Sequence, residues 1–254
     1  MEINFLDLLF SRSFNANTEI PNDRIYFQIE KNTIGTSGNF VTLTGLPKAG
    51  KSTFLSAIIS SGIIGRPVFN FQLNLFPEIR KNKIGWFDTE QSPFDFNRTI
   101  NRVKEFTGLN NEIFDNLDCF LVNSDNTTNI LAMIEAYLLS QPRCGILIID
   151  GLLDLIDNFN DESASKLLIR KLKKWSKEYN ILILTILHLG KKDLSSIGHL
   201  GSASDRYAQS VLNIEKTKNN SFVCSGKFLR SSAGFSPIEI YFNNNSNKYT
   251  QSFT

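Results

Sequence analysis

The sequence predicts an α/β fold in which a mainly parallel sheet is covered by helices on both faces, with antiparallel strands added at the C-terminal edge. Three observations predict it: apolar strand-like runs alternate with amphipathic helical patterns, the runs are apolar at nearly every position, and the alternation stops near residue 205. Strands that alternate with helices are joined by βαβ crossovers, and strands buried on both faces lack polar alternation. The length of 254 residues and the hydrophobic fraction of 41% suit one folded domain.

Five apolar runs are expected as the strands of the parallel sheet. They are residues 40–44, 84–87, 119–122, 145–149 and 181–187. Each run is short and bounded by polar or turn-forming residues, which favours a buried strand over a helix.

Four helices are expected between these strands, at residues 52–59, from 93 onward, at 126–139 and at 162–179. The second has the clearest start, because Ser92 has the spacing of an N-cap from Asp95 and Pro93 suits a first helical turn. In the third helix, Ile130, Ile134 and Tyr137 are expected to face the sheet. The apolar stripe of the fourth consists of Leu168, Leu172, Trp175 and Tyr179.

Three short strands are expected after residue 205, at 211–214, 222–228 and 238–242, separated by polar turns. Short strands joined by such turns are typical of antiparallel pairing. They are therefore expected to extend the sheet at its C-terminal edge.

The charge and cysteine content exclude several classes of protein. The 27 Lys and Arg residues and the 25 Asp and Glu residues give a net charge of +2, so any contact with nucleic acid must be local. Cys119, Cys144 and Cys224 are odd in number and lack the CxxC spacing, which argues against a zinc site and a disulfide framework.

The N-terminus and the apolar runs indicate a cytoplasmic protein without a membrane partner. The first ten residues carry two acidic side chains and no Lys or Arg, unlike a secretory signal. The longest apolar runs are far shorter than the ~20 residues that span a bilayer.

A phosphate-binding motif lies between the first predicted strand and the first predicted helix. The segment reads Gly45-Leu46-Pro47-Lys48-Ala49-Gly50-Lys51-Ser52 and matches the pattern G-x-x-x-x-G-K-[ST], with Thr53 continuing into the helix. The glycines allow backbone N–H groups to face phosphates, Lys51 supplies positive charge to the terminal phosphates, and the Ser52 hydroxyl is a Mg²⁺ ligand. The expected cofactors are therefore ATP and Mg²⁺.

Two acidic residues at the ends of predicted strands complete the expected site. Asp150 follows the run 145–149 and, with Ser52, is expected to hold Mg²⁺. Glu90 lies just beyond the run 84–87 and is a candidate base for the attacking water. The alternatives are a helix cap for Asp150 and a solvated loop carboxylate for Glu90.

The order of these motifs resembles the RecA/DnaB superfamily of ATPases over residues 38–242. After the phosphate loop come a strand ending Asp-Thr-Glu, a strand ending Ile-Ile-Asp-Gly and a strand ending at His188. Pro47 and Lys48 before the second glycine, together with His188 and the later Gly-His-Leu-Gly-Ser-Ala segment, are most similar to the small RepA-type hexameric helicases of plasmids. On this reading the chain is a single RecA-like domain, with residues 1–37 as an N-terminal extension.

The resemblance implies a hexameric ring that hydrolyses ATP at subunit interfaces and moves on single-stranded DNA. It also implies that Glu90 is the catalytic glutamate and that His188 senses the γ-phosphate and leads into a DNA-facing loop. Lys191 and Lys192 lie in that loop and are the candidates for DNA contact. A separate primase or initiator protein is the expected further partner.

A late strand carries the candidate for an arginine that acts on a neighbouring subunit. Related enzymes have a Lys-x-Arg pair there, whereas this chain has two residues between Lys227 and Arg230. In a regular strand these two side chains point to opposite faces, so only one reaches the neighbour unless the strand bulges. Arg230 is favoured because a guanidinium suits a γ-phosphate, and Arg206 is a second candidate.

Two other functions stay open from the sequence. A P-loop kinase for a small molecule predicts a monomer with an arginine-rich lid, for which no segment qualifies. An ATP-dependent regulatory or assembly switch predicts slow hydrolysis and a protein partner in place of DNA.

Overall fold

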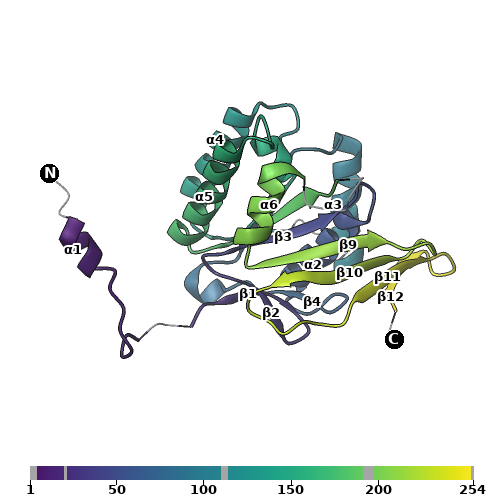
Figure 1. Cartoon of the computed structure of the whole chain (residues 1–254). Helices are drawn as coiled ribbons and strands as arrows, with labels where there is room; N and C mark the ends of the chain where they lie inside the picture. Colours follow the sequence, from purple (N-terminus) through teal and green to yellow (C-terminus); the bar gives the residue numbers. More distant parts are fainter. Residues whose placement is uncertain (1–4, 20–21, 110–113, 191–196, 253–254) are drawn as a thin grey trace.

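A nine-stranded sheet runs through the computed structural model, which describes residues 5–19, 22–109, 114–190 and 197–252 (Figure 1). The strand order is β12-β11-β10-β9-β3-β8-β7-β5-β6. In chain order the strands are β3 (Phe40–Gly45), β5 (Lys83–Asp88), β6 (Leu117–Leu121), β7 (Cys144–Asp150), β8 (Leu182–His188), β9 (Ser210–Lys216), β10 (Phe222–Leu229), β11 (Ile238–Asn243) and β12 (Lys248–Gln251). All five predicted parallel strands are present, which confirms the predicted fold class.

The parallel part of the sheet is one strand larger than expected. β9 pairs parallel with β3 and antiparallel with β10, so the change of direction comes after β9. β10, β11 and β12 follow by antiparallel pairing. The fourth late strand, β12, was not among the predicted ones.

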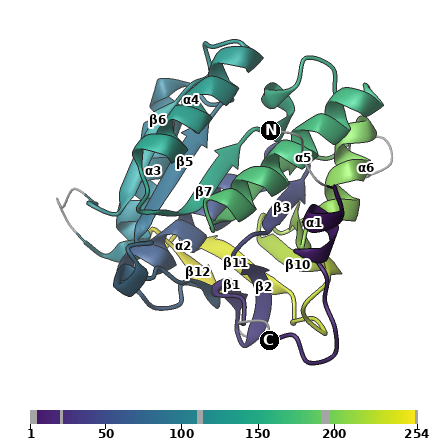
Figure 2. The same ribbon diagram turned by 90° about the vertical axis from the view of Figure 1, so that its left-hand side faces the viewer.

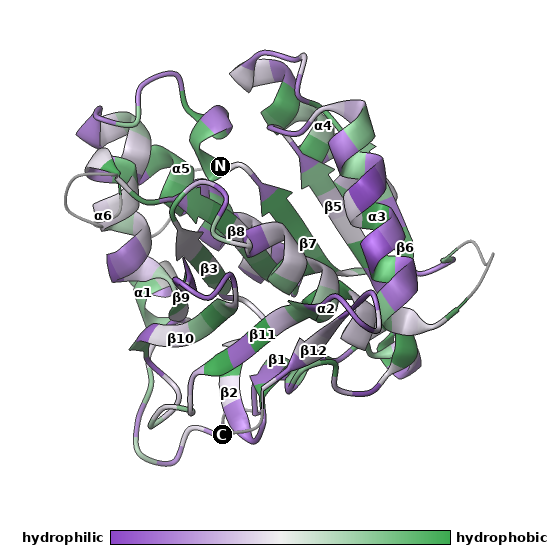
Figure 3. Ribbon diagram, turned by 90° about the vertical axis from the view of Figure 1, so that its right-hand side faces the viewer, coloured by the Kyte–Doolittle hydropathy of each residue, from purple (hydrophilic) through white to green (hydrophobic). Residues whose placement is uncertain are grey.

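Helices cover both faces of this sheet, and successive residues of the central strands enter opposite cores. Ile146 and Ile148 of β7 pack with α2 (Lys51–Ile64) and α3 (Pro93–Thr107). Leu147 and Ile149 pack with α4 (Thr127–Ser140), α5 (Glu162–Glu178) and α6 (Gly198–Tyr207), which lie together in Figure 2. Figure 3 shows the hydrophobic colouring concentrated in β7 and β8. A parallel strand covered on both sides is apolar at nearly every position, and the buried Thr42 and Thr185 of β3 and β8 hydrogen-bond to each other.

The helix signals in the sequence were mostly correct. The Ser92 hydroxyl accepts a hydrogen bond from the Asp95 backbone N–H at 3.1 Å, as an N-cap of α3. In α4 the third buried position is Leu138, whereas Tyr137 is only half-buried. The Tyr137 hydroxyl instead donates to Asp118 Oδ2 at 2.9 Å, so this side chain keeps a polar partner at the edge of the core.

A second, three-stranded sheet forms from β1 (Ile25–Ile29), β2 (Asn32–Thr36) and β4 (Phe71–Leu73), in the order β2-β1-β4. Tyr26, Phe27 and Ile34 are fully buried and belong to the same core as α2 and α3. The second half of the expected extension, 1–37, is therefore packed into the body of the protein. Its first half contains α1 (Phe5–Phe10), which lies apart from both sheets in Figure 1.

The segment after β8 also differs from the expected loop. His188 was expected to lead into a DNA-facing loop that contains Lys191 and Lys192 and, in the sequence, runs to Gly201, but α6 begins at Gly198 and buries Leu200 against α5. Two short 3-10 helices, Pro77–Ile79 and Leu152–Leu155, connect other elements. Among the residues that the structure describes, no helix is both long enough and apolar enough to cross a bilayer.

Candidate active site

Four strands of the parallel sheet end at one edge. β3, β7 and β8 end at the predicted site residues Gly45, Asp150 and His188, and the predicted Glu90 lies two residues beyond the end of β5. Gly45 at the end of β3 pairs in register with His188 at the end of β8, and Asp88 of β5 pairs with Asp150 of β7. Parallel strands bring their carboxyl ends to the same edge, where open α/β sheets bind ligands. Residues that are far apart in the chain, such as Gly45 and His188, thus lie side by side near the start of α2.

The phosphate loop connects β3 to α2 and depends on its glycines. Gly50 has φ of 95°, and a Cβ atom there would lie 2.4 Å from the ring of Phe222 in β10. A Cβ at Gly45 would lie 2.4 Å from the Ile214 carbonyl oxygen. Only glycine fits the close approach at both positions, and the loop is consequently held against β9 and β10.

Lys51 folds back over the loop. Its Nζ atom donates to the carbonyl oxygens of Gly45 at 2.9 Å and Leu46 at 2.8 Å. Burial lowers the pKa of Lys51 to about 8, and the charges of Glu90 and Asp150 partly oppose that shift. A phosphate group beside the amine would favour its protonated form, so the position of Lys51 suits an anionic ligand.

His188 links the phosphate loop to Glu90. Lys51 Nζ lies 2.9 Å from His188 Nδ1, and His188 Nε2 lies 2.8 Å from Glu90 Oε2. A protonated lysine can only donate, so Nδ1 accepts and the imidazole proton is on Nε2, where it is donated to Glu90. Glu90 therefore has a specific partner in the site, which argues against a solvated loop carboxylate.

Asp150 and Asp88 form a buried acidic pair beside this chain of contacts. Both carboxyl groups are nearly inaccessible to solvent. Burial is the main cause that raises the pKa of Asp150 well above its usual range, and the charges of Asp88 and Glu90 add to it. Burial likewise raises the pKa of Asp88. A cation placed beside the pair would lower the energy of the ionised acids.

The donor set fits a hard divalent cation. Ser52 is the second residue of α2, and Asp150 lies at the end of β7, so their hydroxyl and carboxylate oxygens are the candidate ligands. No group of three His, Cys, Asp or Glu side chains suited to a metal occurs in the described part of the chain. Mg²⁺ matches this, because it commonly keeps waters and substrate phosphate oxygens in its shell. The 3-10 helix after β7 is preceded by Gly151, with no side-chain cap, so Asp150 is not its cap.

Three further side chains belong to the site and were not predicted from the sequence. Asp88 Oδ1 accepts from the backbone N–H groups of Glu90 at 3.0 Å and Gln91 at 2.8 Å. Gln91 Nε2 donates to Asp88 Oδ2 and makes a longer contact of 3.4 Å to Asp150 Oδ2. The Thr89 hydroxyl lies 2.7 Å from Asp154 Oδ2. Asp88 could have been identified as a second acid at a strand end, whereas the role of Gln91 depends on strand order.

Arg230 lies at a different part of the molecule. β10 bulges between Gly226 and Phe228, and both long cations then contact α6. Lys227 Nζ lies 2.8 Å from Asp205 Oδ2, and Arg230 Nη2 donates to the Arg206 carbonyl oxygen at 3.0 Å. Lys227 lies at this irregularity and Arg230 follows the last residue of β10, so the geometry of a regular strand does not apply to the pair. The Arg230 and Arg206 side chains are exposed, and Lys191 and Lys192 lie outside the described residues.

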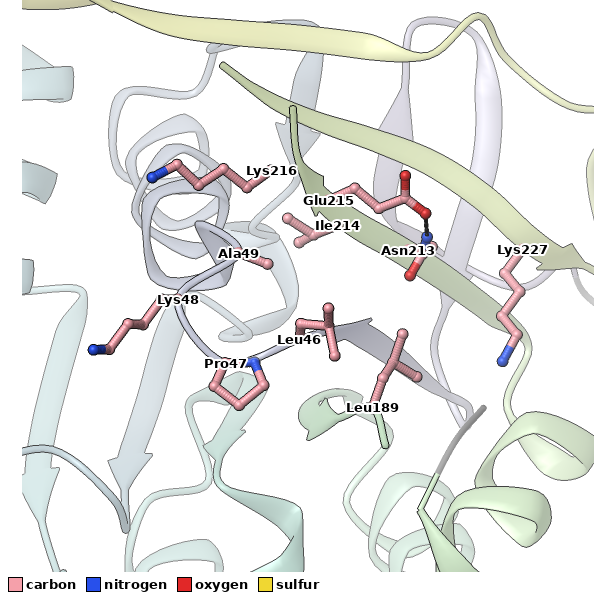
Figure 4. Close-up of a pocket in the computed structure, with 10 residues that line it drawn as sticks. All are labelled: Leu46, Pro47, Lys48, Ala49, Leu189, Asn213, Ile214, Glu215, Lys216 and Lys227. Carbon is pink, nitrogen blue, oxygen red and sulfur yellow. Dashed lines mark hydrogen bonds between the residues drawn. The ribbon is translucent and has the colours of Figure 1, made fainter. Parts of the chain in front are cut away.

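A cavity of about 500 Å³ adjoins the phosphate loop (Figure 4). Within it, Asn213 Nδ2 donates to Glu215 Oε1 at 2.6 Å, drawn as a dashed line in Figure 4. Its lining combines loop residues with the C-terminal half of β9. The lining residues are Leu46, Pro47, Lys48, Ala49, Leu189, Asn213, Ile214, Glu215, Lys216 and Lys227.

Comparison with known proteins identifies the larger part of the chain. A family model described as an AAA domain matches residues 3–193, which is more than half of the chain. The match includes the phosphate loop, Glu90, Asp150 and His188, but ends before α6 and the late strands. No curated protein matches the chain.

Proposed function

The chain belongs to the AAA domain family of RecA-like P-loop ATPases, and we propose that it is an oligomeric ATP-driven motor acting on single-stranded DNA. The finer proposal is a RepA-like replicative helicase of a plasmid or mobile element, assembled as a hexameric ring. A separate primase or initiator protein is then its partner in replication.

The contact chain from Lys51 through His188 to Glu90 is the observation that carries this proposal. It joins Lys51, which is expected to contact the terminal phosphates, to His188 at the end of β8 and to the candidate base Glu90. β8 continues into the segment that contains Lys191 and Lys192. A change at the γ-phosphate can therefore be transmitted through His188 to that segment, as a motor on a nucleic-acid strand requires.

The residues of the site have distinct roles in the proposed hydrolysis. The backbone N–H groups of the loop and Lys51 orient the phosphates. Ser52 and Asp150 would hold Mg²⁺, which when bound supplies positive charge to the phosphate oxygens. Glu90 accepts the proton of the attacking water, and for this its carboxylate must exchange the Nε2–H of His188 for that water. His188 is then able to donate the same N–H to the γ-phosphate.

The near-neutral charge of the chain is compatible with this function. A ring that surrounds one strand needs positive charge only on the loops that face its pore, where lysines contact phosphates without reading bases. Arg230 is proposed as the residue that reaches the ATP site of the neighbouring subunit, because a guanidinium stabilises charge on a transferred phosphoryl group.

The deciding experiment is the ATPase rate of size-fractionated protein with and without single-stranded DNA. We expect a fraction with the mass of a ring, and stimulation of its turnover by the strand. His188→Ala should remove the stimulation, whereas His199→Ala should keep it, because His199 is exposed on α6 and outside the contact chain. A ring fraction that hydrolyses ATP without stimulation would favour the regulatory switch, and a chain that does not hydrolyse ATP would exclude both.

A further inference from the structure

The side chain of Gln91 connects three elements around the acidic pair. Its Nε2 atom donates to Asp88 at the end of β5 and contacts Asp150 at the end of β7. Its Oε1 atom lies 2.9 Å from the hydroxyl of Thr99, which is buried in α3. The backbone oxygen of Gln91 accepts from Asn123 Nδ2 at 2.6 Å. The amide is thus held from both of its ends.

The chemistry of the partners fixes the direction of this amide. Carboxylates that are ionised beside a bound cation only accept hydrogen bonds, so the nitrogen of Gln91 must face the acids and the oxygen must face Thr99. The two hydrogens of the NH₂ group can serve two carboxylates at once. Gln91 therefore provides donors at a place where two buried acids face one another.

Asp88 ties the same unit to the candidate base. Its Oδ1 atom accepts the backbone N–H groups of Glu90 and Gln91, while Oδ2 accepts from the Gln91 side chain. The hydrogen bonds to the Asp88 carboxylate consequently hold the backbone of Glu90 and Gln91, in the loop that follows β5, in one position. The position of Glu90 and the orientation of Asp150 therefore both depend on the hydrogen bonds between Asp88 and Gln91.

We infer that Gln91 is a positioning residue for the divalent cation, which with Asp88 sets the orientation of the Asp150 carboxylate relative to the loop that carries Glu90. This inference rests on the proposed nucleotide hydrolysis and deepens it. Outer partners of metal-binding carboxylates orient the ligand oxygens, and their loss commonly lowers metal affinity by about 10–100-fold. Gln91 acts through Asp150 and does not itself contact the cation.

The test measures binding of a non-hydrolysable ATP analogue by calorimetry, in EDTA and in excess Mg²⁺. Gln91→Met keeps a similar length and flexibility but cannot donate. We expect its affinity in EDTA to stay within about twofold of the wild type, because Lys51 and the loop are intact. The gain in affinity on adding Mg²⁺ should fall by about tenfold, and the Mg²⁺ concentration for half-maximal ATP hydrolysis should rise by a similar factor.

Asn123→Ala is the matched control, because it removes a hydrogen bond of the same residue without touching the acids. It should leave the gain with Mg²⁺ unchanged. Thr99→Val is the second variant, because it removes the support of the Gln91 oxygen and keeps both donors. It should reduce the gain in the same direction but by less, and it decides the question if Gln91→Met does not fold.

Two failures are distinguishable. A wild-type protein that neither gains affinity with Mg²⁺ nor hydrolyses ATP contradicts the proposed function. A wild-type protein that does both, with folded Gln91→Met and Thr99→Val variants that keep the full gain, overturns the role of Gln91. Equal loss in Asn123→Ala and Gln91→Met would likewise overturn it, since a general effect on the loop would then explain both.

Discussion

The carboxyl edge of β3, β5, β7 and β8 and the region where β10 meets α6 both carry predicted site residues, but they differ in how those residues are held. At the first edge, His188 hydrogen-bonds to both Lys51 and Glu90. At the second, the guanidinium of Arg230 is exposed and bonds to a carbonyl oxygen of α6. One region has its candidate catalytic groups assembled within a single chain, whereas the other presents a cation at the surface.

This difference indicates whether the residues of each region act within their own chain or on a neighbouring subunit. Side chains at the ends of paired strands in one chain are held at fixed distances from one another by the sheet, and they can therefore act together on one phosphate. A group that acts on a neighbouring subunit must remain accessible, and its position is completed only on assembly. Mutations at the carboxyl edge should therefore reduce ATP turnover in the mutated subunit itself. Mutations where β10 meets α6 should reduce turnover at the site of the neighbouring subunit.

The largest expected effect is that of Arg230→Ala on turnover. An arginine that stabilises the charge of a transferred phosphoryl group contributes on the order of 10³-fold, so turnover should fall by about that factor while ATP binding persists. The measurement is steady-state hydrolysis at saturating ATP. Because Arg230→Ala and Lys51→Ala damage opposite sides of an interface, mixed assemblies should recover a fraction of the activity.

Arg206→Ala is the control for this prediction. It removes the second candidate side chain but keeps the Arg206 carbonyl that accepts from Arg230. Turnover close to that of the wild type is expected. A strong loss in Arg206→Ala with a mild one in Arg230→Ala would reverse the assignment, and absence of recovery in the mixture would contradict action across an interface.

Glu90→Gln should have the next largest effect. A positioned general base contributes about 10²–10⁴-fold, and glutamine can still accept from His188 but cannot take a proton, so turnover should fall by ~10² or more. Binding of ATP, measured by calorimetry, should be retained.

Glu215→Gln provides the comparison for Glu90→Gln, since Glu215 lines the cavity beside the loop and lies outside the Lys51–His188–Glu90 chain. It should hydrolyse ATP at nearly the normal rate. Near-normal hydrolysis by Glu90→Gln would instead remove Glu90 from the role of base.

The smallest expected effects concern stability and compare two glycines in the two regions. A Cβ at Gly85 in β5 would lie 2.4 Å from the ring of Tyr137, which packs against Phe87 and Phe120. Gly85→Ala should lower the free energy of unfolding by about 2 kcal/mol, as expected for overpacking. A Cβ at Gly226 in β10 would meet only the side-chain end of Leu229 at 2.7 Å, so Gly226→Ala should cost less than about 1 kcal/mol.

Urea denaturation of both variants measures these values. Equal losses would show that β10 is packed as rigidly around Gly226 as β5 is around Gly85. Such a result would weaken the distinction between the carboxyl edge of the parallel strands and the region where β10 meets α6.

Local patterns in the sequence were sufficient to predict features whose residues lie close together in the chain. The phosphate loop and the cap of α3 depend on spacing within about eight residues, and residues so close in sequence fold together. The nearly continuous apolar runs likewise predicted the parallel strands, because burial on both faces disfavours polar side chains at most positions. The small sheet of β1, β2 and β4 was missed, since it joins segments before and after the phosphate loop that are weakly periodic.

The sequence by itself determined the fold class, the phosphate loop and the two acids that follow apolar strands. Only the tertiary structure decided that His188 lies between Lys51 and Glu90, that Asp88 and Gln91 adjoin Asp150, and that Lys227 and Arg230 both bond to α6. The physical reason is that these contacts depend on strand order and register. Both follow from the packing of the whole sheet and leave no local pattern in the chain.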